Sequence, residues 1–174
     1  MTKMDVKNTN YAFIDGNNLY IAITQLGWKL NYKRFRIYLR EKHHVEKAYL
    51  FLGYLSENKL LYGCLRKYGY DLIFKPIVRG EGGKVKGNVD AELVLQTMID
   101  LKNFDKAIFV TGDGDFYCLV KYLRQLDKLG RIIVPNKYRY SVLLRRAAGP
   151  IGFFSFMNDM QKLLEYKNSA QGAE

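Results

Sequence analysis

Four aspartates of this sequence stand at the boundaries of apolar runs. Two short runs, ending at Ile14 and Val110, are followed within three residues by aspartates, and a third, amphipathic run opens with one. The aspartates are Asp15, Asp90, Asp113 and Asp115. Clustered carboxylates repel one another, and a folded site gathers them mainly to hold a hard cation such as Mg²⁺ or Mn²⁺. The pattern therefore predicts metal-dependent chemistry on phosphate groups.

The same residues also allow a purely structural interpretation. An aspartate after an apolar run can cap the following helix, and an acidic residue in a first helical turn is favoured by the helix dipole. Capping accounts for one polar group at each place. Asp15, however, is followed by Asn17 and Asn18, and Asp113 is followed by Asp115. This excess of polar groups favours a ligand site over capping alone.

The apolar runs indicate the elements that must position these side chains. Short apolar runs are typical of buried parallel strands, and longer runs at helical spacing are typical of helices. We predict strands at 10–15, 48–52, 72–74, 107–111 and 131–134, with a last short strand at 151–154. We predict helices at 17–26, 31–42, 57–68, 89–101, 115–129, 138–147 and 157–166.

This alternation predicts an α/β fold, a three-layer Rossmann-like parallel sheet with helices on both faces. If the second and third strands lie on one side of the first, and the fourth and fifth on the other, the strand order is 3-2-1-4-5. The topological switch point, where open α/β sheets bind ligands, then lies between the strands that lead to Asp15 and Asp113. We expect a single domain at 10–166, with polar tails at 1–9 and 167–174.

A net charge of +11 over 174 residues is the clearest global feature of the composition. A positive surface around a small acidic site suits a protein that binds a polyanion such as RNA, and 14 tyrosines offer stacking surfaces for unpaired bases. A flexible, glycine-rich loop at 79–88 can carry lysines to a phosphate. The residues predicted to bind substrate are Asn17, Lys84, Lys86, Arg145 and Arg146.

Other functional classes fit the sequence less well. Zinc needs a cluster of His and Cys ligands, and the chain has two adjacent histidines and two separated cysteines, Cys64 and Cys118, which we expect to be reduced and buried. Phosphate-binding loops ending in Gly-Lys-Ser/Thr are absent from the sequence. The polar N-terminal residues lack the apolar core of a signal peptide, and no apolar stretch is long enough to span a membrane. We therefore expect a cytoplasmic protein.

Three segments resemble the signatures of a known family. They are FIDGNN at 13–18, KGNVD at 86–90 and TGDGDF at 111–116, and their order and spacing are similar to those of the NYN domain. This family belongs to the PIN-like nuclease superfamily and includes the LabA-like proteins. The resemblance covers roughly residues 10–155 and implies a Rossmann-like, PIN-like parallel sheet.

The resemblance also implies a metal-dependent ribonuclease site. Asp15, Asp90 and Asp113 would hold Mg²⁺ or Mn²⁺, with Asp115 near them. Asn18 would position the substrate or a metal-bound water that attacks the phosphodiester in line.

Two hypotheses from different classes follow. The first is a metal-dependent endoribonuclease that acts on single-stranded or exposed RNA. The alternative is a non-catalytic RNA-binding or regulatory module on the same fold. A phosphatase or nucleotidase for a small substrate is a third and weaker candidate. The apolar segment 151–156 can cover a sheet edge or pair with another chain, so a homodimer is also possible.

Overall fold

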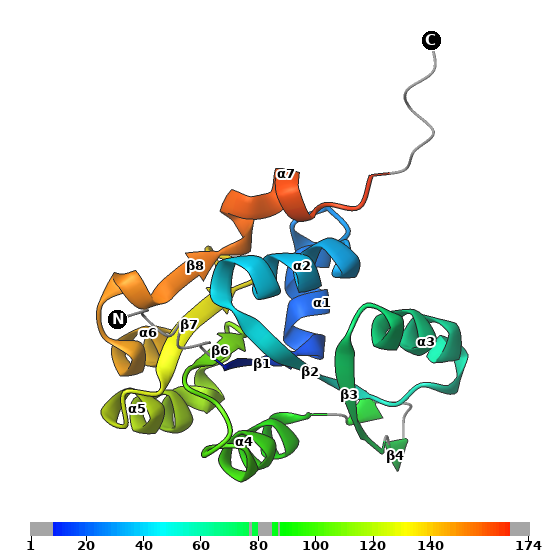
Figure 1. Cartoon of the computed structure of the whole chain (residues 1–174). Coiled ribbons are helices and arrows are strands. Elements are labelled where there is room, and N and C mark those ends of the chain that lie inside the picture. Colours follow the sequence, from blue (N-terminus) through cyan, green and yellow to red (C-terminus); the bar gives the residue numbers. More distant parts are fainter. Residues whose placement is uncertain (1–8, 77, 80–84, 87, 168–174) are drawn as a thin grey trace, which may run out of the picture.

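The computed structural model describes residues 9–76, 78–79, 85–86 and 88–167, so most of each predicted tail lies outside the described residues (Figure 1). Six strands form one sheet in which every neighbouring pair is parallel. From edge to edge they are β3 (Tyr70–Lys75), β2 (Val45–Gly53), β1 (Asn10–Asp15), β6 (Ala107–Val110), β7 (Leu129–Val134) and β8 (Phe154–Phe156). The predicted order is confirmed, and the last short strand extends it beyond β7.

Helices cover both faces of the sheet, which confirms the three-layer prediction. One face carries α1 (Gly16–Gln25), α2 (Tyr32–His43), α3 (Lys59–Lys67) and α7 (Gln161–Leu164), and the other carries α4 (Asp90–Ile99), α5 (Tyr117–Gln125) and α6 (Val142–Ala148). Short 3₁₀ turns stand at Ser56–Asn58, Gly114–Phe116, Ile151–Phe153 and Met157–Met160.

The alternation of side chains along β1 explains why both faces are covered. Ala12 and Ile14 pack with α1 and α2 in one core cluster, whereas Phe13 lies in the other cluster with residues of α4 and α5. All three side chains are fully buried. A central parallel strand of this kind is apolar on both sides, so its sequence is a continuous apolar run.

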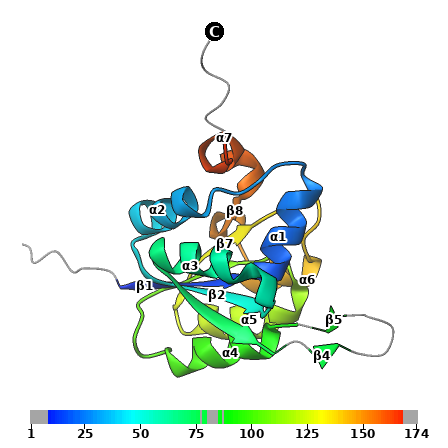
Figure 2. The ribbon, with the colours of Figure 1, turned by 90° about the vertical axis from the view of Figure 1, so that its right-hand side faces the viewer.

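A small antiparallel pair overlaps the glycine-rich segment 79–88, which was predicted as a loop. β4 (Val78–Arg79) pairs with β5 (Val85–Lys86). Figure 2 shows this pair at the side of the molecule toward which β1 runs. Residues 80–84 and 87 of the predicted loop, Lys84 among them, lie outside the described residues.

Several predicted boundaries were wrong. The helix predicted at 115–129 is a 3₁₀ turn followed by α5, which ends at Gln125 because Asp127 takes a left-handed backbone conformation (φ 54°) and β7 begins at Leu129. The strand predicted at 151–154 begins at Phe154, because residues 151–153 form a 3₁₀ turn after Pro150.

The prediction that both cysteines are buried was also wrong, since Cys64 and Cys118 are exposed. On α3, Tyr62 and Leu65 face the sheet, and the Tyr62 ring packs on Phe74 of the edge strand β3 with 4.7 Å between ring centroids. A helix over an edge strand buries a narrow stripe, which leaves Cys64 outside it. Among the described residues, no helix is both long enough and apolar enough to cross a membrane.

Candidate metal centre

Asp15 is the last residue of β1 and the N-cap of α1. Its Oδ1 accepts a hydrogen bond from the backbone N–H of Asn18 at 3.0 Å, so the capping role is confirmed. Its Oδ2 accepts one from the hydroxyl of Thr111 at 3.4 Å. The residue is only 4% exposed. Capping therefore occupies one carboxylate oxygen, and the other faces the neighbouring strand β6.

Thr111, the residue after β6, links Asp15 to Asp113. Its Oγ1 donates to Asp15 and accepts a hydrogen bond from the backbone N–H of Asp113 at 3.1 Å. Asp113 in turn caps the 3₁₀ turn Gly114–Phe116, because its Oδ1 accepts from the backbone N–H of Asp115 at 3.0 Å. One buried hydroxyl thus fixes the relative position of two carboxylates.

Asp90 is the first residue of α4, and Asn88 holds it from both sides. The Asn88 side chain donates from Nδ2 to Asp90 Oδ2 at 2.6 Å and accepts at Oδ1 from the Asp90 backbone N–H at 3.0 Å. Lys75, the last residue of β3, donates from Nζ to the Asn88 carbonyl at 2.5 Å and pairs with Glu92 at 3.5 Å. The turn before α4 is therefore tied to the carboxyl end of β3.

These contacts bring three carboxylates from separate parts of the sequence together. One oxygen each from Asp15, Asp90 and Asp113 lies within 4.8 Å of the oxygens of the other two. The first and third follow β1 and β6, the neighbouring strands on either side of the topological switch point. The carboxyl ends of these strands meet at one edge of the sheet, as the sequence predicted.

The electrostatics of the cluster favour a cation. Burial, with smaller contributions from the neighbouring carboxylates of Asp90 and Asp113, raises the pKa of Asp15 above its usual range, to about 6. Burial and the nearby Asp113 and Asp115 also raise the pKa of Asp90. Within the described part of the chain, none of the three clustered carboxylates forms an ion pair. An all-oxygen set of carboxylates without a direct ion pair could hold a hard divalent cation.

Close packing, rather than an unusual backbone angle, accounts for two glycines at the centre. A Cβ on Gly16 would lie 2.6 Å from the carbonyl oxygen of Phe51, and one on Gly114 would lie 2.2 Å from Ser141 Oγ. Neither glycine has a positive φ angle. Gly16 lets α1 begin against β2, and Gly114 lets the Asp113 turn lie against the first turn of α6.

Two of the remaining predicted site residues, Asn18 and Asp115, are joined by hydrogen bonds to the segment after β6 that carries Asp113. The Oδ1 of Asn18 accepts a hydrogen bond from the Gly112 backbone N–H at 2.9 Å. Asp115 is exposed beside Asp113, and Asn17 is exposed in the first turn of α1. Arg145 and Arg146 are exposed in the last turn of α6. Lys86 lies in β5.

Sequence reasoning missed three residues of this centre: Lys75, Asn88 and Thr111. Asn88 precedes Asp90 by two positions and Thr111 precedes Asp113 by two, and in both cases the earlier side chain accepts a hydrogen bond from the aspartate's N–H. That local spacing is the signal that could have found them. No comparable local signal marks Lys75, whose partner is thirteen residues away.

The sequence profile of the NYN domain matches residues 11–150, a range that contains all three clustered aspartates. The chain belongs to the NYN domain family. As an NYN domain it has the fold of the PIN-like nucleases, and the predicted family is confirmed.

This NYN domain is similar to two known proteins. Over 122 residues it is 26% identical to the low amplitude and bright protein LabA of Synechococcus elongatus, a match that covers 64% of this chain and 66%, just under two thirds, of LabA. It also resembles the crystal structure of a protein of unknown function from Vibrio parahaemolyticus, with a TM-score of 0.75 and 22% identity. That match covers 95% of this chain and all of the other, and it shows a shared fold.

Proposed function

We propose that this NYN domain is a metal-dependent endoribonuclease that hydrolyses phosphodiester bonds of single-stranded or otherwise exposed RNA. The observation that carries the proposal is the convergence of Asp15, Asp90 and Asp113 to within 4.8 Å at the switch point of the sheet. Each carboxylate is held by hydrogen bonds from neighbouring residues. The set is therefore organised before any ion binds, which lowers the cost of binding one.

The three aspartates would hold a Mg²⁺ or Mn²⁺ ion through oxygen atoms. Such an ion would lower the pKa of a water molecule and would offset the negative charge of the phosphate. Asp15 must lose its proton before it can bind the ion, so cation affinity rises as the pH passes about 6. We assign the role of proton acceptor to Asp115, which is exposed and whose charge helps to raise the pKa of Asp90. The Oδ1 of Asn18 accepts a hydrogen bond from the Gly112 N–H, so the amide nitrogen of Asn18 is left to donate to the substrate.

The charge of the chain supports a polyanionic substrate. The net charge is +11 although the centre itself is acidic, so basic side chains dominate elsewhere in the chain. Attraction of this kind acts on any phosphate backbone and carries no base specificity. The residues that we assign to substrate binding are Asn17, Lys84, Lys86, Arg145 and Arg146. A homodimer and a cytoplasmic location stay predictions.

The proposal is tested by incubating the purified chain with labelled single-stranded RNA, in EDTA and in Mn²⁺, beside two variants. Asp113→Asn removes one ligand charge but keeps an oxygen to cap the Asp115 N–H. Asp127→Asn is the matched control, because this exposed aspartate pairs with Lys106 and belongs to the turn before β7.

We expect metal-dependent cleavage by the wild type and by Asp127→Asn, and its loss in Asp113→Asn with the fold intact. Equal cleavage by all three proteins would show that the site is wrongly assigned or that a contaminating nuclease is present. Binding of RNA without metal-dependent cleavage would instead favour the alternative, a non-catalytic RNA-binding module.

A further inference from the structure

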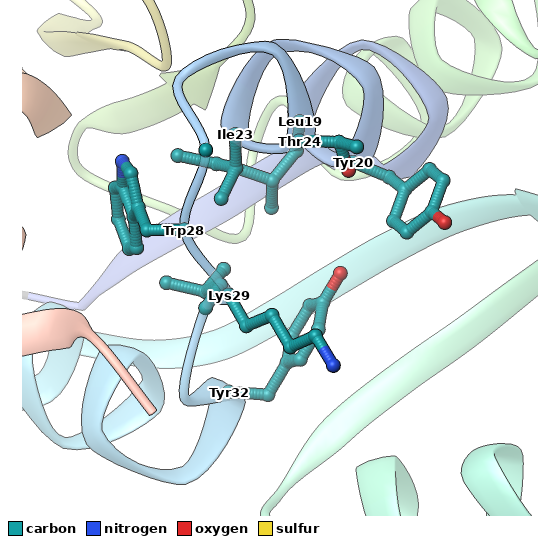
Figure 3. Close-up of a pocket in the computed structure, with 9 residues that line it drawn as sticks. Leu19, Tyr20, Ile23, Thr24, Trp28, Lys29 and Tyr32 are labelled. Atoms are coloured by element: carbon teal, nitrogen blue, oxygen red, sulfur yellow. The ribbon is translucent and has the colours of Figure 1, made fainter. Parts of the chain in front are cut away.

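A pocket of about 480 Å³ lies along α1 and the segment that follows it (Figure 3). This volume is in the range of pockets that hold small organic groups, roughly 300–1,000 Å³. Figure 3 shows Trp28 and Tyr20 at opposite ends, with Lys29 and Tyr32 between them. The lining residues are Leu19, Tyr20, Ile23, Thr24, Gly27, Trp28, Lys29, Leu30 and Tyr32. Aromatic rings and aliphatic side chains thus supply most of the wall.

The polar groups of the pocket are few and neutral or positive. Burial raises the pKa of Tyr32 to about 12, with a further contribution from Tyr20, so the Tyr32 hydroxyl keeps its proton at neutral pH. This hydroxyl makes no hydrogen bond to any residue that the structure describes. Lys29 is exposed at the rim, and none of the lining residues that the structure describes is acidic. The pocket therefore offers an unused donor and a positive rim to an occupant.

The pocket is connected to the metal centre through α1. The helix begins directly after its cap, Asp15, and Tyr20 lies five residues further on, about 8 Å along the axis at the usual rise per residue. Tyr20 is 66% exposed, so its ring is open to solvent at one end of the pocket. A strand whose phosphate lies at the carboxylates would thus bring adjacent bases toward Tyr20.

We propose that this pocket binds one unpaired base of the RNA strand that lies across the metal centre. The inference rests on the proposed function and adds a subsite to it. Bases stack on aromatic rings irrespective of sequence, and their edges form hydrogen bonds with neutral donors. The ring of Tyr20 supplies the stacking face, the hydroxyl of Tyr32 supplies the donor, and Lys29 lies where the adjoining phosphate passes.

An unpaired base fits this site better than a free phosphate or a peptide. A phosphate would need several converging donors, and among the described lining residues Lys29 alone is cationic. A peptide that adds a strand would need unpaired backbone groups along an edge, whereas the wall here is made mainly of side chains from α1, the segment after it and the first residue of α2. A base in a duplex cannot enter, so the pocket also implies a preference for single strands.

The test measures binding rather than cleavage, so that it does not depend on turnover. Anisotropy of a labelled single-stranded RNA is titrated in EDTA with the full chain and four variants. Tyr20→Ala removes the stacking ring, Tyr20→Phe keeps it, and Tyr32→Phe removes only the hydroxyl. Tyr122→Ala is the matched control, because it removes an exposed tyrosine from α5 on the opposite face of the sheet.

We expect Tyr20→Ala to weaken single-strand binding about tenfold or more and Tyr32→Phe about fivefold. Tyr20→Phe and Tyr122→Ala should bind as the wild type does, and no variant should change the weaker binding of duplex RNA. Equal binding by Tyr20→Ala and Tyr122→Ala would overturn the base pocket, even if the wild type cleaves RNA. A Tyr20-dependent affinity without metal-dependent cleavage would overturn the nuclease proposal and leave the pocket standing.

Discussion

The side-chain Oδ1 of Asn18 accepts a hydrogen bond from the backbone N–H of Gly112 at 2.9 Å. These residues are 94 positions apart in the sequence. The bond joins the first turn of α1 to the segment after β6, and each of these two segments carries a carboxylate of the cluster. The spacing between Asp15 and Asp113 therefore depends on an amide side chain that is not itself a metal ligand.

Replacing Asn18 by alanine should loosen this junction. The Gly112 N–H, in a buried stretch of backbone, would lose its acceptor, at a cost of about 1–3 kcal/mol. Urea unfolding in EDTA measures the loss. Asn58→Ala provides the control, because the Asn58 side chain forms no capping hydrogen bond. Similar unfolding midpoints for both variants would show that the Asn18–Gly112 bond contributes little.

The raised pKa of Asp15 predicts a specific dependence of stability on pH. Burial keeps the proton on the folded protein up to about pH 6, whereas the unfolded chain releases it near pH 4. The folded state thus binds more protons between these values, and stability falls as the pH rises through them, by up to about 3 kcal/mol from this group. Asp15→Asn should remove that decline. Unfolding curves of both proteins in EDTA from pH 4 to pH 7 measure the difference, and parallel pH profiles would contradict the assignment.

Thr111 is predicted to matter through its hydroxyl rather than its shape. Thr111→Val leaves the part-buried Asp113 N–H without its acceptor and the Asp15 Oδ2 without its donor. We therefore expect the free energy of unfolding to fall by about 1–3 kcal/mol and Mn²⁺ binding to weaken. Thr111→Ser keeps the hydroxyl and should retain Mn²⁺ affinity. Calorimetric titration with Mn²⁺ compares the three proteins. Should the valine variant bind Mn²⁺ as tightly as the wild type, Thr111 does not organise the centre.

Gly114 and Gly63 form a matched pair of glycines. A Cβ on Gly114 would overlap Ser141 Oγ, so Gly114→Ala should destabilise the chain by about 1–3 kcal/mol and displace the turn that carries Asp113. Gly63 lies within α3 with open space around its added Cβ, so Gly63→Ala should be neutral or stabilising by up to about 1 kcal/mol. Thermal unfolding measures both, and a neutral Gly114→Ala would contradict the close contact with α6.

The sequence was sufficient to predict the part of the centre that depends on strand ends. Asp15 and Asp113 follow apolar runs, and parallel strands that neighbour each other end at one edge, so their proximity follows from the topology. Asp90 was singled out at the start of an amphipathic run after a glycine-rich loop. Its place beside the two strand ends was implied only by the family resemblance, because a first helical turn contains no information about distant strands.

What the sequence did not predict depends on contacts between distant segments or on how much of a helix is covered. The bond from Lys75 to the Asn88 carbonyl exists because the carboxyl end of β3 lies beside the turn before α4. Cys64 was predicted to be buried because it lies within an apolar helical pattern, yet α3 covers the sheet with a narrower stripe. The local spacing of residues in the sequence does not show which segment lies beside a strand end. It also does not show how much of a helix surface is covered by the sheet.

The most direct test of the proposed chemistry compares the Mn²⁺ concentration that gives half-maximal RNA cleavage with the Mn²⁺ dissociation constant of the same protein. If the carboxylates of Asp15, Asp90 and Asp113 hold the ion that acts on RNA, the two values coincide. Asp113→Asn should then shift both to higher concentration, whereas Asp127→Asn should shift neither. Cleavage that saturates independently of the measured Mn²⁺ binding, or that persists in Asp113→Asn with binding lost, would contradict the account.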